Sequence, residues 1–234
     1  MKANGIDMYH GDNREDAHLS DAQLVDKFKG MLDAGIFWIF HKVSEGTDVV
    51  DPRFLRRRDC AKRAGYRFFG GYHFLHRTNI QAQADNFIKS AQDDGVMAFA
   101  TDFEQSSYTP TLANARDFGA LVDTNYKVRS KLYGGGLIRD LLQPIKAGHV
   151  NPRMVSIEQA FAKRDLWLSE YGPHERIPWP WSDPKIGALV NGEEAAPGAW
   201  AWQYSEKGRV AEIVGNVDLN WFNGTADDMA KRWR

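Results

Sequence analysis

The chain has 234 residues, of which 43 % are hydrophobic and 26 % charged, and its net charge is −1. These values are ordinary for a globular protein that buries a sizeable core, and the charge balance argues against nucleic acid or an anionic membrane as the main partner. Cys60 is the only cysteine, which excludes an intrachain disulfide.

The first residues, MKANGIDMYHGDN, lack the apolar stretch of a signal peptide. The longest apolar run near the start, GIFWIF, is far shorter than the roughly 20 residues that a membrane helix needs. We therefore expect a soluble protein that is made in the cytoplasm, does not insert into a membrane and is a monomer.

Strands and helices are predicted to alternate five times from the N-terminus. Short apolar segments indicate strands, and helical spacing with Ser or Pro at the start and Gly at the end indicates helices. The predicted strands are 5–11, 36–44, 66–74, 96–104 and 129–136, and the predicted helices are 20–35, 51–65, 79–95, 111–126 and 137–145. This alternation predicts a parallel sheet.

The pattern changes in the last third of the chain. Three further strand-like segments, 165–171, 199–205 and 215–222, are separated by loops rich in Pro, Gly and Trp, and 225–234 could form a last helix. Eight strands of this kind could close an irregular TIM-like (β/α)5(β)3 barrel, and one domain over 1–234 is the simplest interpretation. Such a barrel places its chemistry at the carboxyl ends of its strands.

Acidic residues gather at these predicted strand ends. In MAFATDFEQ (97–105), Asp102 and Glu104 finish an apolar strand, and alternation turns both toward one face. Asp7 lies in the first predicted strand, Glu45 follows the second and Asp218 lies in the last. Two neighbouring carboxylates oppose each other's ionisation, a cost that is more common at a working site than in a core.

Glycoside hydrolysis is the chemistry that needs carboxyl groups in one cleft. A protonated acid donates to the leaving oxygen, while an ionised partner supports the positive charge that develops on the sugar. A like-charged neighbour helps to keep the proton on the donor. Solvated acids, or acids paired with Arg and Lys, are the structural alternative.

Seven motifs together resemble glycoside hydrolase family 25, the Chalaropsis-type lysozymes, which are N-acetylmuramidases found among phage endolysins and bacterial autolysins. The similarity extends from about residue 5 to 224. In chain order the motifs are GIDMYHG, KVSEGTDVVDPRF, GGYHF, DFE, LWLSEY, WQYS and GNVDLNWF.

The resemblance implies hydrolysis of the β-1,4 bond between N-acetylmuramic acid and N-acetylglucosamine in peptidoglycan, without metal or cofactor. By position, Glu104 matches the general acid, Asp102 its partner carboxylate, and Asp7 and Asp218 the other acids of the site. Asp102 would either attack directly or orient the substrate's N-acetyl group. The chain departs from the family pattern at Met8-Tyr9-His10 and at Thr101, changes expected to affect the lining near the acids.

No cell-wall-binding repeat follows the motifs, so we expect a lone catalytic domain that reaches the wall by release or by another export system. Further residues could contact the glycan, with core packing or ion pairing as the alternative for each. These are Glu45, Tyr72, His73, Tyr133, Trp167, Gln203 and Tyr204. The basic run RFLRRRDCAKR (53–63) is expected to face water.

Three other functions stay open at this point. A metal-dependent hydrolase could use His41, His73 and His76 with Asp7 or Asp102, although no H-x-H or H-E-x-x-H spacing occurs. A wall-binding or phage structural module could retain the fold without turnover. A chitinase-like glycosidase could also use the D-x-E pair.

Overall fold

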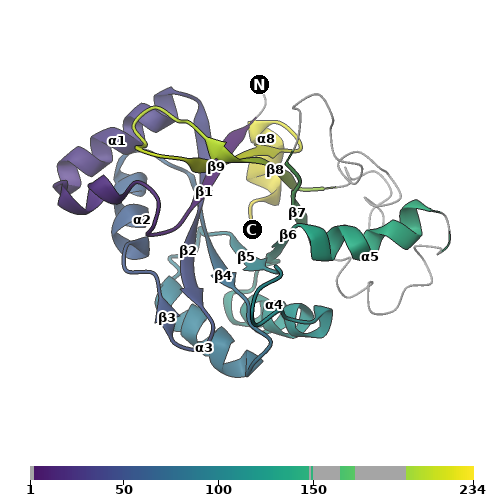
Figure 1. Ribbon diagram of the computed structural model, residues 1–234. Coiled ribbons are helices and arrows are strands. Elements are labelled where there is room, and N and C mark those ends of the chain that lie inside the picture. The colour runs from purple at the N-terminus through teal and green to yellow at the C-terminus, as the bar shows by residue number, and fades with distance from the viewer. Residues whose placement is uncertain (1–2, 148, 150–163, 172–198) are drawn as a thin grey trace.

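The computed structural model describes residues 3–147, 149, 164–171 and 199–234, and their centre is a closed barrel of eight strands (Figure 1). Around the barrel the order is β1-β9-β8-β7-β6-β5-β4-β2, and β1 pairs again with β2. The bounds are β1 Asn4–Met8, β2 Ile36–Glu45, β4 Phe68–Phe74, β5 Phe99–Asp102, β6 Lys131–Gly134, β7 Leu166–Ser169, β8 Ala201–Gly208 and β9 Val217–Phe222.

Each of the first five barrel strands is followed by an α-helix, which confirms the predicted (β/α)5(β)3 order. These helices are α1 Asp21–Asp33, α2 Phe54–Arg63, α3 Ile80–Ala91, α4 Leu112–Tyr126 and α5 Gly136–Lys146, and α8 Ala226–Arg232 lies near the C-terminus. Two short elements were not predicted: the 3₁₀ helix η1 Arg14–His18 and β3 Val49–Val50, which pairs with the end of β2. None of the described helices is both long and apolar enough to span a membrane.

The strand β9 runs antiparallel to both of its neighbours, β1 and β8. The other seven barrel strands are mutually parallel. The prediction of a parallel sheet is therefore wrong for the last strand. The chain runs through β9 in the direction opposite to that of the other barrel strands. As a result, the beginning of β9 lies at the same rim as the ends of the parallel strands.

Large aromatic side chains fill the barrel. The ring of Trp38 lies 5.8 Å from that of Trp167 and 5.4 Å from that of Trp200, edge to face in both cases. At Gly5 a Cβ atom would lie only 2.1 Å from the Trp38 ring, so only glycine leaves room for it. Trp167 is thus a core residue at this level of the barrel, 1 % exposed.

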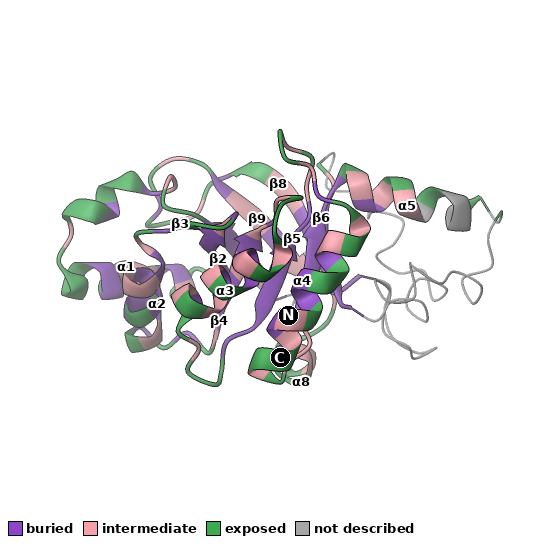
Figure 2. Cartoon of the chain, turned by 90° about the horizontal axis from the view of Figure 1, so that it is seen from below, coloured by how far each residue is buried: buried purple, intermediate pink, exposed green. Residues whose placement is uncertain are grey.

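A second apolar core lies between the strands and the helices. It takes the side chains that alternate outward, such as Ile39, Phe69, Phe99 and Phe103. Figure 2 shows the buried residues concentrated on the strands, while the helices stay exposed along one side. This outer core holds the strands in place and leaves their inward side chains to form the barrel lumen and its rim.

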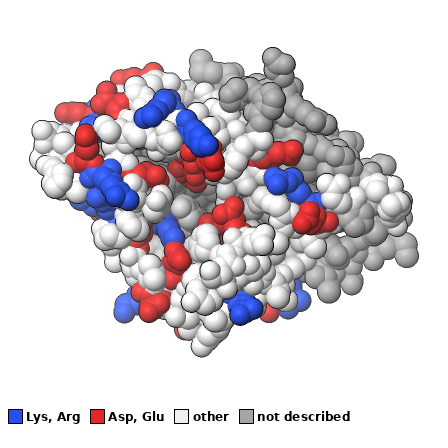
Figure 3. Space-filling model, viewed as in Figure 1, with Lys and Arg blue, Asp and Glu red and all other residues white. Residues whose placement is uncertain are grey.

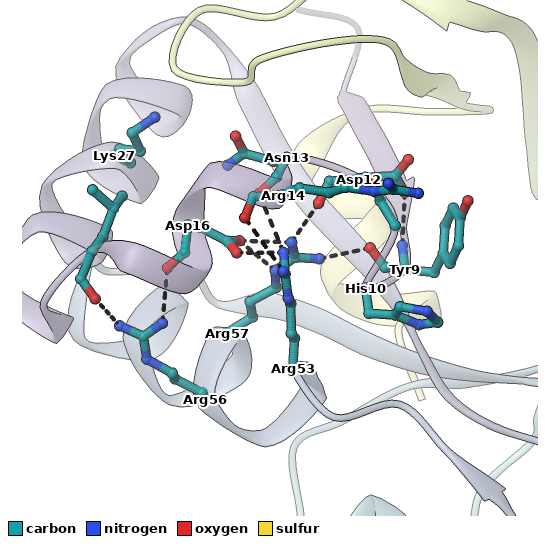
Figure 4. A network of polar contacts seen from close by, with 12 residues as sticks. Tyr9, His10, Asp12, Asn13, Arg14, Asp16, Lys27, Arg53, Arg56 and Arg57 are labelled. Carbon is teal, nitrogen blue, oxygen red and sulfur yellow. Dashed lines mark hydrogen bonds and ion pairs between the residues drawn. The ribbon is translucent and has the colours of Figure 1, made fainter.

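An arginine cluster ties the segment after β1 to helix α2 (Figure 4). The Arg57 side chain, 1 % exposed, donates from Nε to Asp16 Oδ2 at 2.6 Å and from its Nη atoms to the backbone oxygens of Tyr9 and Asp12. Arg53 donates from Nη1 to Asp16 Oδ1 at 2.7 Å. The prediction that the basic run faces water is therefore wrong for this part, because its arginines satisfy the carbonyls and the carboxylate of a folded loop.

Candidate active site

Four acids meet at the rim where the parallel strands end. Asp7 lies near the end of β1, Asp102 ends β5, and Asp218 is the second residue of the antiparallel β9, directly opposite Asp7. Glu104 follows two residues after Asp102, and Phe103 between them packs into the outer core, so both carboxyl groups turn toward the lumen. Figure 3 shows several acidic side chains around a hollow on one face of the molecule.

Two amides hold Asp7. Its Oδ2 atom accepts hydrogen bonds from Asn220 Nδ2 at 2.7 Å and from Gln203 Nε2 at 2.8 Å. Asn220 is in turn fixed by Trp167, whose Nε1 donates to its Oδ1 at 2.7 Å. The buried tryptophan thus orients an amide that orients the acid.

Burial raises the pKa of Asp7 to about 6, although the amides of Asn220 and Gln203 favour its charged form. Burial also raises the pKa of Asp218 to about 9, and the negative charge of Asp7 adds to this shift. At neutral pH Asp218 is therefore protonated and can donate to an ionised Asp7. The two opposed acids share one negative charge.

The pKa values of the second pair, Asp102 and Glu104, are raised as well. Burial raises the pKa of Asp102 well above its ordinary value, and the charge of Glu104 raises it further. Burial likewise raises the pKa of Glu104, while a hydrogen bond with Tyr133 lowers it. The Asp102 Oδ1 atom is buried and has no hydrogen-bond partner within the described structure. A carboxyl oxygen that is desolvated and unbonded is poised to interact with a ligand.

Gln203 connects the acids to two tyrosines. Its Oε1 atom accepts from Tyr133 Oη at 2.9 Å and from Tyr171 Oη at 2.5 Å, while its Nε2 atom donates to Asp7. Tyr72 lies on the same side of the lumen. Burial raises the pKa of its phenol well above the usual value, and the charges of Asp7 and Asp102 raise it further, so the phenol lies close to both acids. Gln203, Tyr133 and Tyr72 are thus brought together with the acids.

Glu45 lies at the end of β2, where it forms an ion pair with Lys42 and lies 3.4 Å from His76 Nε2. Lys42 lowers and Glu45 raises the pKa of Asp102, so both lie close enough to act on it electrostatically. Glu45 therefore has structural partners and also borders the site. Lys42, which faces the same side as Phe40, is a charged residue of the rim that the sequence analysis missed.

Two predicted contacts point away from the lumen. His73 is fully buried on the outer side of β4, where it stacks on Phe118 and bonds to Ser44 and Gln83. Tyr204 alternates outward from Gln203 and packs against Trp202 and Trp221. Trp167 reaches the site indirectly, through its hydrogen bond to Asn220 and its ring contact with Tyr133 at 4.7 Å. Thr101, expected near the lining, is fully buried on the outer face of β5.

Three further residues of the site escaped the sequence analysis besides Lys42. Tyr171 lies two residues after the end of β7 and is 48 % exposed. Asn220 could have been found by side-chain alternation, because it is polar and follows Asp218 by two residues in the same strand. Asp12 lies in the loop after β1, and its charge raises the pKa of both Asp7 and Asp218.

A groove of about 630 Å³ opens beside Glu104. Its walls come from the segments after β5, β6, β7 and from the far part of β8. The lining residues are Glu104, Gln105, Gly135, Gly136, Leu137, Arg139, Ser169, Glu170, Tyr171 and Glu206. Glu104 is the rim acid that faces this groove.

Of the three histidines considered as metal ligands, His41 and His73 are buried on the outer side of the barrel, and His76 lies beside Glu45. His41 is buried outside the barrel, where its Nε2 lies 2.9 Å from Arg57, and burial lowers its pKa to about 3. His73 lies between β4 and α4. Within the described ranges, no group of three or more His, Cys, Asp or Glu side chains is arranged to hold a metal ion.

Comparison with curated proteins identifies lysozymes as relatives. Lysozyme M1 of Streptomyces globisporus is 28 % identical over 208 residues, which cover 82 % of this chain and 62 % of the relative. The autolytic lysozyme of Clostridium acetobutylicum is 25 % identical over 220 residues, which cover 94 % of this chain and 55 % of the relative. The chain therefore spans less than two thirds of the length of these relatives.

Solved structures share the barrel fold. A lysozyme from Streptomyces coelicolor has a TM-score of 0.69 at 23 % identity, over 100 % of this chain and 97 % of that one. The catalytic domain of endolysin ply40 from the Listeria monocytogenes phage P40 has a TM-score of 0.63 at 19 % identity, over 99 % and 97 %.

A family model decides the assignment that the barrel and the motifs indicate. The model described as glycosyl hydrolases family 25 matches residues 6–135, more than half of the chain, including Asp7, Asp102 and Glu104. The resemblance seen in the sequence is thereby confirmed: the chain belongs to glycosyl hydrolases family 25.

Proposed function

We propose that this protein is an N-acetylmuramidase that hydrolyses the β-1,4 bond between N-acetylmuramic acid and N-acetylglucosamine in peptidoglycan. The observation that carries the proposal is the carboxyl pair of the buried Asp102 and the partly buried Glu104, which opens onto a groove at the carboxyl rim of the barrel. Family membership and the lysozymes among the relatives support the same activity.

Glu104 is the proton donor in this proposal. It lines the groove, so a glycosidic oxygen can reach it, and burial holds its pKa above the ordinary value. A donor must keep its proton until the bond breaks, and must lose it as the leaving oxygen becomes basic. The hydrogen bond with Tyr133 limits the upward shift and keeps the acid able to donate.

Asp102 is the partner carboxylate. It is buried deeper than Glu104, and its unbonded Oδ1 is free for the substrate. Positive charge that develops on the sugar, as Glu104 passes its proton to the leaving oxygen, favours the ionised form of Asp102. The Oδ1 atom could then support the anomeric carbon directly or accept a hydrogen bond from the substrate's N-acetyl N–H.

Asp7 and Asp218 determine the charge that the first acid pair presents to the substrate. Because Asp218 keeps its proton to about pH 9, the pair presents one negative charge at neutral pH. A single charge adds to the stabilisation of a cationic transition state, whereas two would oppose the ionisation of Asp102. The substrate is peptidoglycan, so the enzyme acts on the cell wall after release or export.

The products of digestion test the proposed bond. Purified peptidoglycan is digested, reduced with borohydride and analysed by mass spectrometry, with Glu104→Gln as the control. Reduced N-acetylmuramic acid at the new ends is the expected result. Reduced N-acetylglucosamine would mean that the other glycosidic bond is cleaved, and faster cleavage of chitin oligomers would favour a chitinase. Binding to several wall types without new ends would indicate a non-catalytic module.

A further inference from the structure

The groove beside Glu104 has a defined position relative to the bond that breaks. Glu104 is one of the described residues that line the groove. The other three rim acids, Asp7, Asp102 and Asp218, do not line it. In glycoside hydrolysis the proton donor contacts the leaving oxygen, and the partner carboxylate lies at the anomeric carbon. The groove therefore extends from the leaving-group side of the site. This placement rests on the proposed function.

Tyr171 provides an aromatic surface in this groove. Its side chain is 48 % exposed, yet its hydroxyl group is anchored by the 2.5 Å hydrogen bond to Gln203, which also holds Asp7. A ring that is fixed at one end and open to solvent can stack on the apolar face of a sugar with little loss of side-chain freedom. The leaving sugar thus has a platform next to the proton donor.

Charged side chains of both signs lie further along the groove. Arg139, in the first turn of α5, donates from Nη1 to the backbone oxygen of Ser169, which holds its guanidinium group against the wall. Glu206 lies on β8 and is paired at 3.6 Å with the exposed Lys207, an interaction that contributes little. Glu206 can exchange this partner for a cation of a ligand.

These charges have no counterpart in a neutral sugar chain. In peptidoglycan, however, the N-acetylmuramic acid that follows the leaving N-acetylglucosamine carries a peptide with carboxylates and, at its diamino acid, an amine. A guanidinium group binds a carboxylate and a carboxylate binds an ammonium group. We propose that the groove binds a peptide-substituted strand on the leaving-group side, with Arg139 contacting a carboxylate and Glu206 the amine of its peptide.

The test compares two substrates that differ in the peptide and in the lactyl carboxylate that its removal exposes on N-acetylmuramic acid. Glycan strands carrying peptides are hydrolysed in parallel with the same strands after removal of the peptides by an amidase, and kcat/KM is measured for both. The wild-type protein is expected to prefer peptide-bearing strands by a factor on the order of fivefold, the range of one or two partly exposed charge pairs. The preference should lie mainly in KM, because these contacts are remote from the bond.

Two variants assign the preference to the groove. Arg139→Gln and Glu206→Gln should each reduce the ratio toward one, because each loses more kcat/KM on peptide-bearing strands than on stripped strands. Arg116→Gln, an exposed arginine of α4 paired with Asp117, and Glu212→Gln, an exposed acid outside the groove, are the matched controls and should keep the wild-type ratio. Amidation of the peptide carboxylates should lower the wild-type ratio and leave that of Arg139→Gln as it is.

Other results would overturn the inference. A wild-type ratio of one would mean that the groove does not contact the peptide. Equal losses on both substrates in Arg139→Gln would make this arginine a contact to the sugar or a structural residue. Absence of new N-acetylmuramic acid ends on both substrates in the wild-type protein would instead contradict the proposed function, so the two failures are distinguishable.

Discussion

Two regions of the barrel bury aspartates in opposite ways. In the arginine cluster of Figure 4, Asp16 is 2 % exposed and both of its carboxylate oxygens accept from arginines, Arg53 and Arg57. At the rim, Asp7, Asp102 and Asp218 are held among amides, tyrosines and one another. Burial without sufficient positive charge raises their pKa values.

The difference separates structural from chemical acids. A carboxylate paired with arginines stabilises the segment that it anchors. Asp165 is paired in the same way with Lys131 and Arg232, which lower its pKa. A carboxyl group with a raised pKa destabilises the fold when it ionises but can exchange a proton at neutral pH. The predictions below use substitutions that remove charge from one region or the other.

The largest expected effect is on turnover at the rim. Glu104→Gln keeps the shape of the side chain and removes the proton donor, so kcat on peptidoglycan should fall by roughly 10²–10⁴-fold. Thermal unfolding should show a melting temperature no lower than that of the wild type. If more than about a tenth of the rate remained, Glu104 would not be the general acid.

The next effect is on stability in the arginine cluster. Asp16→Asn leaves Arg57 buried without its charge partner, and we expect the free energy of unfolding to fall by about 3–5 kcal/mol. Urea denaturation measures this change. Asp26→Asn is the control, since Asp26 is 73 % exposed in its pair with Lys29 and should change stability by less than about 1 kcal/mol.

An Asp→Asn substitution at the rim should change the free energy of unfolding in the opposite direction. Asn at position 218 can donate to Asp7 as the protonated acid does but cannot ionise, so Asp218→Asn should stabilise the fold at pH 7 by about 0.5–2 kcal/mol while reducing turnover. A loss of stability comparable to that of Asp16→Asn would contradict the distinction between the two regions.

The pH dependence of stability tests the same difference between the arginine cluster and the rim. Native Asp218 keeps its proton to about pH 9, whereas in the unfolded chain it loses the proton near its ordinary value of 3.8. The unfolded state binds fewer protons between these values, so wild-type stability should fall as pH rises from about 4 to about 9. Asp218→Asn should flatten this slope in urea titrations, and an unchanged slope would remove Asp218 as its source.

The smallest expected effect concerns the donor's pKa. Tyr133→Phe removes the hydrogen bond that lowers the pKa of Glu104, so the basic limb of the kcat/KM profile should move to higher pH. The profile is measured on peptidoglycan across neutral and alkaline pH. A shift of the limb to lower pH would show that Tyr133 favours the protonated form of Glu104.

Much of the fold could be predicted, because alternating apolar strands and capped helices are local patterns. Asp102 and Glu104 followed from side-chain alternation at one strand end. The direction of β9 could not be predicted, since nothing local to residues 217–222 distinguishes an antiparallel from a parallel partner. Asp218 was expected at a strand end, yet it reaches the rim because it lies near the start of a reversed strand.

Alternation could also have sharpened the predicted site. Tyr72 and His73 are neighbours in one strand, as are Gln203 and Tyr204, so only one of each pair can face the lumen. The structure brings Tyr72 and Gln203 to the acids and turns His73 and Tyr204 outward. Alternation along the predicted strand 165–171 also puts Tyr171 on the same side as Trp167, so it could have been included among the site residues.

The most direct test of the account is whether Glu104 acts by giving a proton to the leaving group. Turnover of Glu104→Gln is measured on natural glycan strands and on an aryl glycoside of the peptidoglycan disaccharide, whose leaving group needs no proton. We predict near wild-type rates on the aryl glycoside and a loss of at least about 10²-fold on the natural strand, whereas Asp102→Asn should lose activity on both. Equal losses of Glu104→Gln on the two substrates would contradict the account.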